Sequence, residues 1–370
     1  MKLKIFSFFL VMCITAGIMS SCTVKRYDRW LYGIHADFQD MEWENLNPDE
    51  SIDLLNMLGV NVVRVALNNN LVMSDNETFI EEKAQARQAQ MQALSDAGIK
   101  ILAVNSTWFL PQDVQAQSPS DMFLPERDLT EGSDYMRFLD DYEIMWENMA
   151  RKFPLVTYWQ TGNEPNQTLW FHKKDNAYFP VQESMAVNVD MMYRAARAIR
   201  RVNPEAVIVM PALAPLSNLE TSLKIIYDYI QSGEYGSTNV DDYFNIAAWH
   251  PYVQPGYTAS MWARLQKGIY KICEEKGDTE RRVIFTETGF TGGGEGDFWK
   301  QMYDHVRSDL PFVDGMVVYC MTSHALTGNS FGIFNTDPQT GSFIPLQPAW
   351  DLQNLFGGEG DLAKYDRMSS

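Results

Sequence analysis

The sequence predicts a single α/β domain, a (β/α)8 TIM barrel in which eight parallel strands alternate with helices. Three observations support this fold class. Eight short apolar runs follow one another along the 370-residue chain, amphipathic segments fill the intervals, and no Pro-, Gly- or Ser-rich linker interrupts the series. A doubly wound sheet is the alternative, but no glycine-rich phosphate-binding turn follows the first strand.

The apolar runs define the strands in chain order. The predicted strands are 30–34, 60–66, 99–104, 156–160, 206–210, 246–249, 282–286 and 315–319. Apolar residues at helical spacing predict helices between them, and the clearest are 50–58, 84–97, 134–152 and 184–202. Two connections are long, 106–133 after the third strand and 166–183 after the fourth. In a barrel such loops cover the catalytic face and set specificity.

The first 21 residues are typical of an export signal that precedes the barrel domain of residues 30–370. Two lysines precede an apolar run at 5–18, and two serines stand directly before Cys22. This order resembles a bacterial lipoprotein signal, although Met19 stands where leucine is usual. The resemblance implies cleavage before Cys22, lipidation of that cysteine, a linker over 22–29 and an outer-membrane anchor. An ordinary signal peptide and an uncleaved anchor are the alternatives.

Composition and charge exclude several classes of function. The formal net charge of −18 argues against nucleic acid and anionic membrane surfaces as partners, and leaves neutral ligands such as sugars open. The 10 Trp and 17 Tyr supply both core packing and rigid contact surfaces. With Cys13 removed and Cys22 lipidated, only Cys273 and Cys320 remain, on a helical pattern and on a strand, so we expect two free thiols.

Two of the predicted strands end in a glutamate. The fourth strand leads into Asn163-Glu164-Pro165, and the seventh leads into Glu287. The carboxyl ends of parallel strands meet at one end of a barrel, so we expect both side chains there. An unpaired carboxylate is costly at a buried strand end, which makes a purely structural purpose a poor explanation. Two such glutamates are the arrangement that glycoside hydrolysis needs.

Further polar residues lie at neighbouring strand ends. Arg64, inside the second strand, needs an anion, and Glu287 is its expected partner. His250 and Tyr252 follow the sixth strand and His35 ends the first, with a structural role as the alternative for either histidine. The five histidines show no metal-ligand spacing, and HExxH and CxxC motifs are absent from the sequence. No serine lies in a GxSxG elbow, in which the motif would connect a predicted strand to a helix. The sequence therefore predicts no metal, no cofactor and no serine esterase.

At the level of strand order, nearly the whole mature chain resembles the clan A glycoside hydrolases. Their signature is an Asn-Glu pair ending strand four and a Glu ending strand seven, here Asn163-Glu164 and Glu287. The local motifs are most similar to the family 39 type. These motifs are Gly162-Asn-Glu-Pro-Asn166, His250-Pro-Tyr252, and Phe331-Gly-Ile-Phe334 followed by Pro348-Ala-Trp350.

The resemblance implies a mechanism and assigns roles to individual residues. It implies that Glu164 is the general acid/base and Glu287 the nucleophile of a retaining hydrolase acting on β-linked poly- or oligosaccharides. In such enzymes the two carboxyl groups stand about 5–5.5 Å apart. The resemblance also implies that Asn163 contacts the sugar 2-hydroxyl, and that Tyr252 and Arg64 position Glu287.

Aromatic residues are the expected platforms for sugar rings. Many relatives carry a Trp on strand eight, whereas this chain has Tyr319 in the run Val-Tyr-Cys-Met, so Tyr319 or another aromatic is expected to replace it. Trp108 and Trp170, in the two long loops, are the best candidates for stacking. Core packing is the alternative for each of them, and for the further candidates Trp249, Tyr257 and Trp262.

Three functions stay open at this point. The first is a retaining β-glycosidase on an exported, membrane-anchored lipoprotein, expected to act as a monomer on the periplasmic or surface side of the outer membrane. The second is a non-catalytic, glycan-binding surface lipoprotein with a degenerate barrel, which the altered strand eight favours and the two retained glutamates do not. The third is a barrel lyase or aldolase, which would need a strand-end lysine or metal ligands that these strand ends lack.

Overall fold

The structure is a computed structural model, and it describes the barrel and most of its loops. The described residues are 30–36, 48–116, 123–167, 179–254, 256–290, 297–321, 331–336 and 343–365. Cys22, the preceding signal and Trp170 lie outside these ranges, so export, lipidation and stacking by Trp170 stay predictions.

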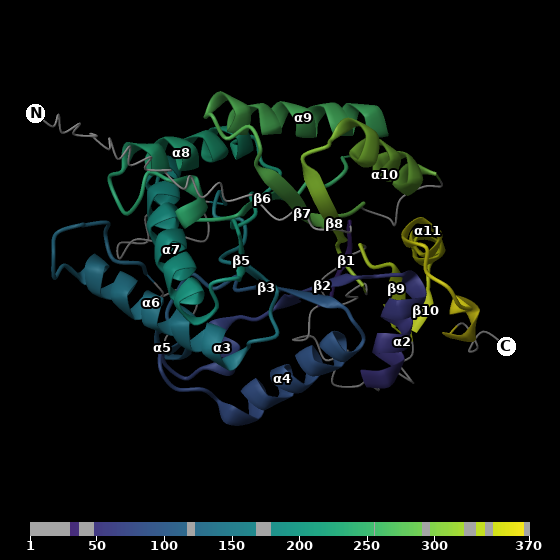
Figure 1. The fold of residues 1–370 in the computed structure, drawn as a ribbon, viewed down its shortest axis with the longest axis horizontal. Coiled ribbons are helices and arrows are strands. Elements are labelled where there is room, and N and C mark those ends of the chain that lie inside the picture. Colours follow the sequence, from purple (N-terminus) through teal and green to yellow (C-terminus); the bar gives the residue numbers. More distant parts are fainter. Residues whose placement is uncertain are drawn as a thin grey trace, which may run out of the picture.

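Eight parallel strands close into a barrel in sequence order, with β8 paired to β1, as Figure 1 shows at the centre of the molecule. The strands are β1 (Leu31–His35), β2 (Val62–Ala66), β3 (Lys100–Val104), β4 (Tyr158–Gln160), β5 (Val207–Val209), β6 (Ile246–Trp249), β7 (Arg282–Thr288) and β8 (Val313–Val318). The predicted (β/α)8 fold class is confirmed, and each predicted strand is present with bounds that differ by at most two residues.

Helices cover the outside of the barrel in the described part of the chain. They are α2 (Pro48–Leu58), α3 (Asn69–Val72), α4 (Glu81–Asp96), α5 (Pro111–Ala116), α6 (Asp134–Lys152), α7 (Val181–Val202), α8 (Leu219–Ser232), α9 (Ala259–Glu275), α10 (Phe298–Asp309) and α11 (Gln347–Phe356). After β8 the chain adds an antiparallel pair, β9 (Phe334–Thr336) and β10 (Phe343–Pro345). The predicted helix 134–152 coincides with α6, whose start is fixed by the Ser133 side chain accepting a hydrogen bond from the Met136 N–H.

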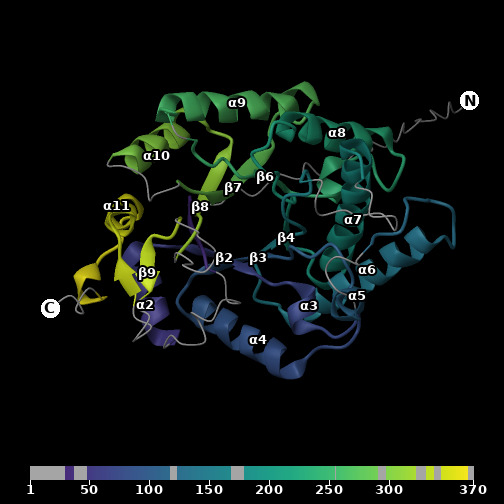
Figure 2. The same ribbon diagram turned by 180° about the vertical axis from the view of Figure 1, so that it is seen from behind.

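The first and last described helices lie side by side and complete the ring around the barrel. Figure 2, seen from behind, places α11 next to α2. The side chain of Gln353 on α11 donates to the carbonyl of Met57 on α2 at 3.0 Å. Among the described residues no helix combines the length and the apolar character needed to cross a membrane. Cys273 and Cys320 are both buried thiols outside any disulfide, as predicted.

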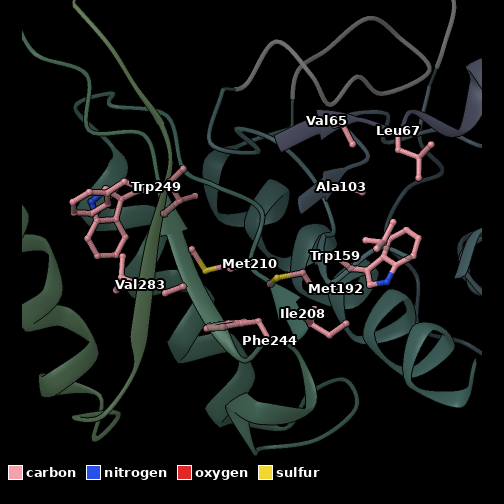
Figure 3. Close-up of a cluster of buried hydrophobic side chains, with 14 of the residues drawn as sticks. Val65, Leu67, Ala103, Trp159, Met192, Ile208, Met210, Phe244, Trp249 and Val283 are labelled. Atoms are coloured by element: carbon pink, nitrogen blue, oxygen red, sulfur yellow. The ribbon is translucent and has the colours of Figure 1, made fainter. Parts of the chain in front are cut away.

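The core has two layers, because successive strand residues point to opposite faces of the sheet. Inward-facing side chains such as Val62, Tyr158 and Ile284 fill the barrel itself. Outward-facing neighbours such as Trp159 pack against the helices, and Figure 3 shows part of this outer layer around Val65, Ala103, Trp159, Met192, Ile208, Met210, Phe244, Trp249 and Val283. Further along the strands, toward their carboxyl ends, the inward-facing positions become polar, and these polar side chains form a candidate site.

Candidate active site

A polar layer lies directly above the apolar layer inside the barrel. Val62, Tyr158, Ala248 and Ile284 belong to the inner apolar cluster. Two positions further along the same strands stand Arg64, Gln160, His250 and Thr286, all nearly or fully buried. Because side-chain direction alternates with a period of two, these four side chains point into the barrel at its carboxyl-terminal end.

Arg64 is the centre of this layer, and each of its nitrogens has a partner. Nη1 lies 2.6 Å from Glu287 Oε1 and 3.1 Å from His35 Nδ1. Nε donates to Gln160 Oε1 at 2.9 Å, and Nη2 donates to Asn163 Oδ1 at 2.7 Å. A guanidinium can only donate, so it fixes the orientation of both amides. The NH2 group of Asn163 therefore faces away from Arg64.

Glu287 is held as a carboxylate. It is 9% exposed, and its Oε2 accepts a hydrogen bond from the Tyr252 hydroxyl at 2.7 Å. Burial raises the pKa of Glu287, but electrostatic interactions with His250, Arg64 and His35 outweigh this effect. Together with the Tyr252 hydroxyl they lower the pKa of this carboxyl from 4.5 to about 2. Burial and the Glu287 charge raise the pKa of Tyr252, which stays a hydrogen-bond donor.

Glu164 lies on a tight turn just beyond β4. Its φ of 52° is the only positive value at a non-glycine residue in the described chain. Such left-handed backbone costs on the order of 1–3 kcal/mol and concentrates at functional sites. The Glu164 N–H donates to the Ala212 carbonyl at 2.7 Å, and the Asn166 side chain bonds both the N–H and the carbonyl of Ala214. The turn is thus fastened to the segment that follows β5.

The two carboxylates approach each other across His250. His250 Nδ1 lies 2.8 Å from Glu164 Oε1 and 3.4 Å from Glu287 Oε2. One carboxylate oxygen of each glutamate and this nitrogen all lie within 4.8 Å of one another. Among the described residues these three form the one group with metal-type ligands so close together. Arg64 already neutralises Glu287, however, and its positive charge disfavours a cation at this point.

Aromatic rings border the site on the side of strand eight. Tyr319 directly follows β8, is half-buried, and lies 5.1 Å from His35 and 6.1 Å from Tyr252 between ring centroids. Phe331 joins them, 5.3 Å from the Tyr252 ring. Gly289 permits this packing, because a Cβ there would meet the Tyr319 carbonyl at 2.7 Å and the Phe331 ring at 3.0 Å.

The three tryptophans predicted as further sugar platforms, Trp108, Trp249 and Trp262, are buried in the structure. Trp108 is 2% exposed, and its indole packs so closely under Gly162 that an added Cβ would stand 2.1 Å from it. Trp249 and Trp262 are fully buried core residues, and their indole N–H groups donate to Gln266 Oε1 and to the Pro251 carbonyl. Tyr257 is half-buried and packs against the outer core layer. The Trp262 bond fixes the backbone between His250 and Tyr252.

Sequence reasoning brought Arg64, Asn163, Glu164, His250, Tyr252 and Glu287 to one site, and the structure places them together. Sequence reasoning did not identify Gln160, Thr286 and Gln167 as site residues. The Gln167 amide donates to Glu164 Oε2, while Gln160 and Thr286 are fully buried in the polar layer. Gln160 and Thr286 had a signal in the sequence: each stands two positions after an inward apolar residue, where the same alternation aims it inward.

A closed (β/α)8 barrel with glutamates at the ends of strands four and seven defines a clan A glycoside hydrolase. The chain belongs to glycosyl hydrolase family 5: the family model described as Cellulase (glycosyl hydrolase family 5) matches residues 31–308. This supports the clan that the sequence indicated. The nearer resemblance to family 39 is not supported by the match.

Solved structures share the fold at low sequence identity. The β-glycosidase BGL167 is 12% identical with a TM-score of 0.64, covering 90% of this chain and 97% of that chain. A family 1 glycoside hydrolase of Thermotoga maritima, bound to a cyclophellitol analogue, is 13% identical with a TM-score of 0.63 and coverages of 90% and 98%. A β-glucosidase from Thermotoga maritima in complex with castanospermine is 14% identical with a TM-score of 0.62 and coverages of 90% and 99%. A search of the curated proteins gives no match.

Proposed function

We propose that this protein is a retaining O-glycoside hydrolase that cleaves β-linked poly- or oligosaccharides by double displacement. Glu287 is the nucleophile and Glu164 is the general acid/base. Arg64 and Tyr252 hold Glu287 for attack, and the NH2 group of Asn163, turned away from Arg64, meets a hydroxyl of the sugar. Tyr319 is the aromatic platform of strand eight.

One observation carries the proposal: two glutamates lie close together in unequal surroundings. Their nearest oxygens lie within 4.8 Å, as expected for carboxyl groups about 5–5.5 Å apart in retaining enzymes and unlike the roughly 6.5–9.5 Å of inverting enzymes. Only Glu287 contacts Arg64, and its pKa is lowered to about 2. Glu287 is therefore ionised near neutral pH, as a nucleophile must be.

The reaction follows from this difference between the carboxyls. Glu287 Oε attacks the anomeric carbon while protonated Glu164 gives its proton to the leaving glycosidic oxygen, so one C–O bond forms as the other breaks. The intermediate is a neutral ester of Glu287, and the negative charge now rests on Glu164. Glu164 then removes a proton from water, which attacks the same carbon and releases Glu287.

Product stereochemistry and covalent trapping test the proposal. The chain is first screened on β-glucans, mannans, xylans and aryl β-glycosides to find an accepted sugar. With that sugar, NMR of the first product should show the β-anomer, and a 2-fluoro β-glycoside with a good leaving group should label Glu287. The α-anomer as first product, or a label on another residue, would overturn the retaining assignment.

We further propose that the protein is exported and anchored to the outer membrane through lipidated Cys22. The support is the order of two lysines, the apolar run 5–18 and the two serines before Cys22. Several acyl chains on one cysteine are needed for firm anchoring, because a single chain binds only marginally. Cys22→Ser should lose incorporation of labelled fatty acid and leave the membrane fraction or stay unprocessed. Unchanged labelling would contradict the proposal.

A further inference from the structure

A chain of buried hydrogen bonds connects the arginine beside Glu287 to the opposite glutamate. Arg64 Nε donates to Gln160 Oε1 at 2.9 Å, and Gln160 Nε2 donates to Thr286 Oγ1 at 3.3 Å. Thr286 Oγ1 lies 3.2 Å from His250 Nε2, and His250 Nδ1 lies 2.8 Å from Glu164 Oε1. Gln160, Thr286 and His250 are all 0% exposed, so none of them exchanges these partners for solvent.

The direction of each bond follows from Arg64. The guanidinium has donors only, so the Gln160 oxygen must face it and the Gln160 NH2 must face Thr286. That NH2 occupies one lone pair of the Thr286 oxygen. His250 Nε2, at 3.2 Å, is an acceptor within reach of the Thr286 hydroxyl proton, and we assign the bond in this direction. A neutral imidazole that accepts at Nε2 carries its own proton on Nδ1, the nitrogen that faces Glu164.

We propose that Gln160 and Thr286 are positioning residues that fix His250 in the Nδ1–H tautomer, so that His250 donates a hydrogen bond to the Glu164 carboxylate. The inference rests on the acid/base role proposed for Glu164. In the first half of the reaction Glu164 loses its proton, and the His250 N–H stabilises the carboxylate that is left. In the second half it keeps that carboxylate oriented while the other oxygen works on water. Neither Gln160 nor Thr286 touches the substrate.

Several charged and titratable groups surround His250, and they define what the test must control. They are Glu164 on the turn after β4, Glu287 on β7, Tyr252 after β6, and, through Glu287, Arg64 on β2 and His35 on β1. A substitution that leaves all five in place while altering only the Thr286 hydroxyl isolates the tautomer. Thr286→Val has this property, because it replaces the hydroxyl by a methyl group of similar size. Thr286→Ser keeps the hydroxyl and is the matched control.

Kinetics give the first readout. Without the hydroxyl, His250 is free to place its proton on Nε2, and the Glu164 carboxylate loses a charge-assisted donor. The basic limb of the kcat/KM profile on a natural glycan, which reports loss of the acid proton, should move up by about one pH unit in Thr286→Val. On a dinitrophenyl glycoside kcat/KM should be unchanged, while kcat, limited by the base step, should fall about tenfold. Thr286→Ser should behave as the unaltered enzyme. A Thr286→Val enzyme with an unshifted profile would overturn the proposal.

The second readout is the tautomer itself, and it does not depend on turnover. In ¹⁵N NMR of the unaltered protein, labelled at its five histidines, the His250 Nδ1 should carry the proton and Nε2 should not. Gln160→Glu puts an acceptor opposite Thr286, which turns the hydroxyl away from His250 and should move the proton to Nε2. A proton on Nε2 in the unaltered protein refutes the relay even if Thr286→Val does not fold. A correct tautomer in a protein that hydrolyses no glycan would instead refute the proposed function alone.

Discussion

Glu287 lies within a seven-residue strand of the barrel, whereas Glu164 lies on a left-handed turn beyond a three-residue strand. Glu287 is fixed by Arg64 and Tyr252, whose side chains are themselves anchored in or beside the barrel. The Glu164 carboxylate contacts the buried His250, but the backbone that carries it is placed by loop contacts. These are the Ala212 carbonyl, the Gln167 amide and the Asn166 side chain, which ties the turn to the segment after β5.

The difference matches the two tasks. A nucleophile attacks one carbon along one line, so a position set by the barrel core serves it. An acid/base serves two atoms in turn, the leaving oxygen and a water molecule, and a carboxyl on a fastened turn can meet both. We therefore expect substitutions at Glu287 and its partners to affect every substrate. Substitutions around Glu164 should instead discriminate between good and poor leaving groups.

The largest effect is expected for Glu287→Ala. No covalent intermediate can form, and turnover should fall by roughly 10⁴-fold or more on every glycoside, good leaving groups included. Azide should occupy the space of the lost carboxylate and attack from the opposite face to the leaving group. The measurement is NMR of the product formed from a dinitrophenyl β-glycoside, which should be the α-glycosyl azide. A variant that still turns over the natural glycan at a tenth of the normal rate would remove Glu287 from the mechanism.

Glu164→Ala should differ from Glu287→Ala in two ways: its loss of activity should depend on the leaving group, and the rescued product should have the opposite anomeric configuration. A natural sugar alcohol must be protonated as it leaves, so turnover on glycans should fall roughly 10²–10⁴-fold. A dinitrophenolate leaves without help, so the first step on that substrate should be spared and the glycosyl-enzyme should accumulate. Azide needs no deprotonation and should restore turnover with the β-glycosyl azide as product. Equal losses on both substrates, with no rescue, would make Glu164 a binding or structural residue.

Arg64→Met tests how the nucleophile is kept ionised. The pKa of Glu287 lies below its ordinary 4.5, so the ionised group stabilises the fold above about pH 4.5, and this stability is lost as the pH falls toward 2. Without Arg64, one of the groups that lower the pKa of Glu287 is lost, so this pKa should rise and the acid limb of kcat/KM should move up in pH. At pH 7 the free energy of unfolding should fall by about 3–5 kcal/mol, as for a broken buried pair.

Arg281→Met is the matched control for that substitution. Arg281 is also buried, 5% exposed against 1% for Arg64, and it pairs with Asp278 and Asp241. It precedes β7, at the opposite end of the strand from Glu287. Urea unfolding should show a comparable loss of stability. The acid limb of its kcat/KM profile should stay where it is in the unaltered enzyme. A shift of that limb in both variants would mean that it follows stability and not the charge on Glu287.

The barrel and the two glutamates could be predicted because their signals are local. Apolar runs of strand length and a polar residue at the end of each run are visible in a few consecutive residues, as in the run that ends at Glu287. The inward direction of Gln160 and Thr286 could have been predicted from the alternation of side-chain direction along their strands. Their partners, however, come from other strands, and the pairing of Gln160 with Arg64 spans 96 positions of the chain.

The positions of the aromatic side chains could be predicted only in part from the sequence. Trp108 stands in a long loop, which suggested an open position, but the sequence does not say which side of a loop faces the protein, and its indole fills the space under Gly162. The outward direction of Trp249, into the core, could have been predicted, because His250 points inward and the residue before it must then point outward. The left-handed backbone of Glu164 left no trace in the sequence, since glutamate has no preference for that conformation.

The smallest effect is expected for Asn166→Ala, and a second asparagine makes it interpretable. Asn166 is 1% exposed; its Oδ1 accepts from the Ala214 N–H at 2.7 Å and its Nδ2 donates to the Ala214 carbonyl at 3.0 Å. Asn61 makes the same kind of bridge just before β2: its Oδ1 accepts from the Tyr32 N–H and its Nδ2 donates to the Trp30 carbonyl, both at 2.8 Å.

Either alanine substitution leaves backbone groups unpaired and should lower the free energy of unfolding by about 1–3 kcal/mol. Only Asn166→Ala loosens the turn that carries Glu164, so only this variant should lose activity according to leaving group. We expect about a tenfold lower kcat/KM on a natural glycan and almost no change on a dinitrophenyl glycoside, since a small misplacement of a catalytic group has a cost of this order or more. Asn61→Ala should be neutral on both substrates. If the two variants lose activity alike, or if Asn166→Ala loses it equally on both substrates, the acid/base does not depend on the turn. The contrast between a core-held nucleophile and a loop-held acid would then fail.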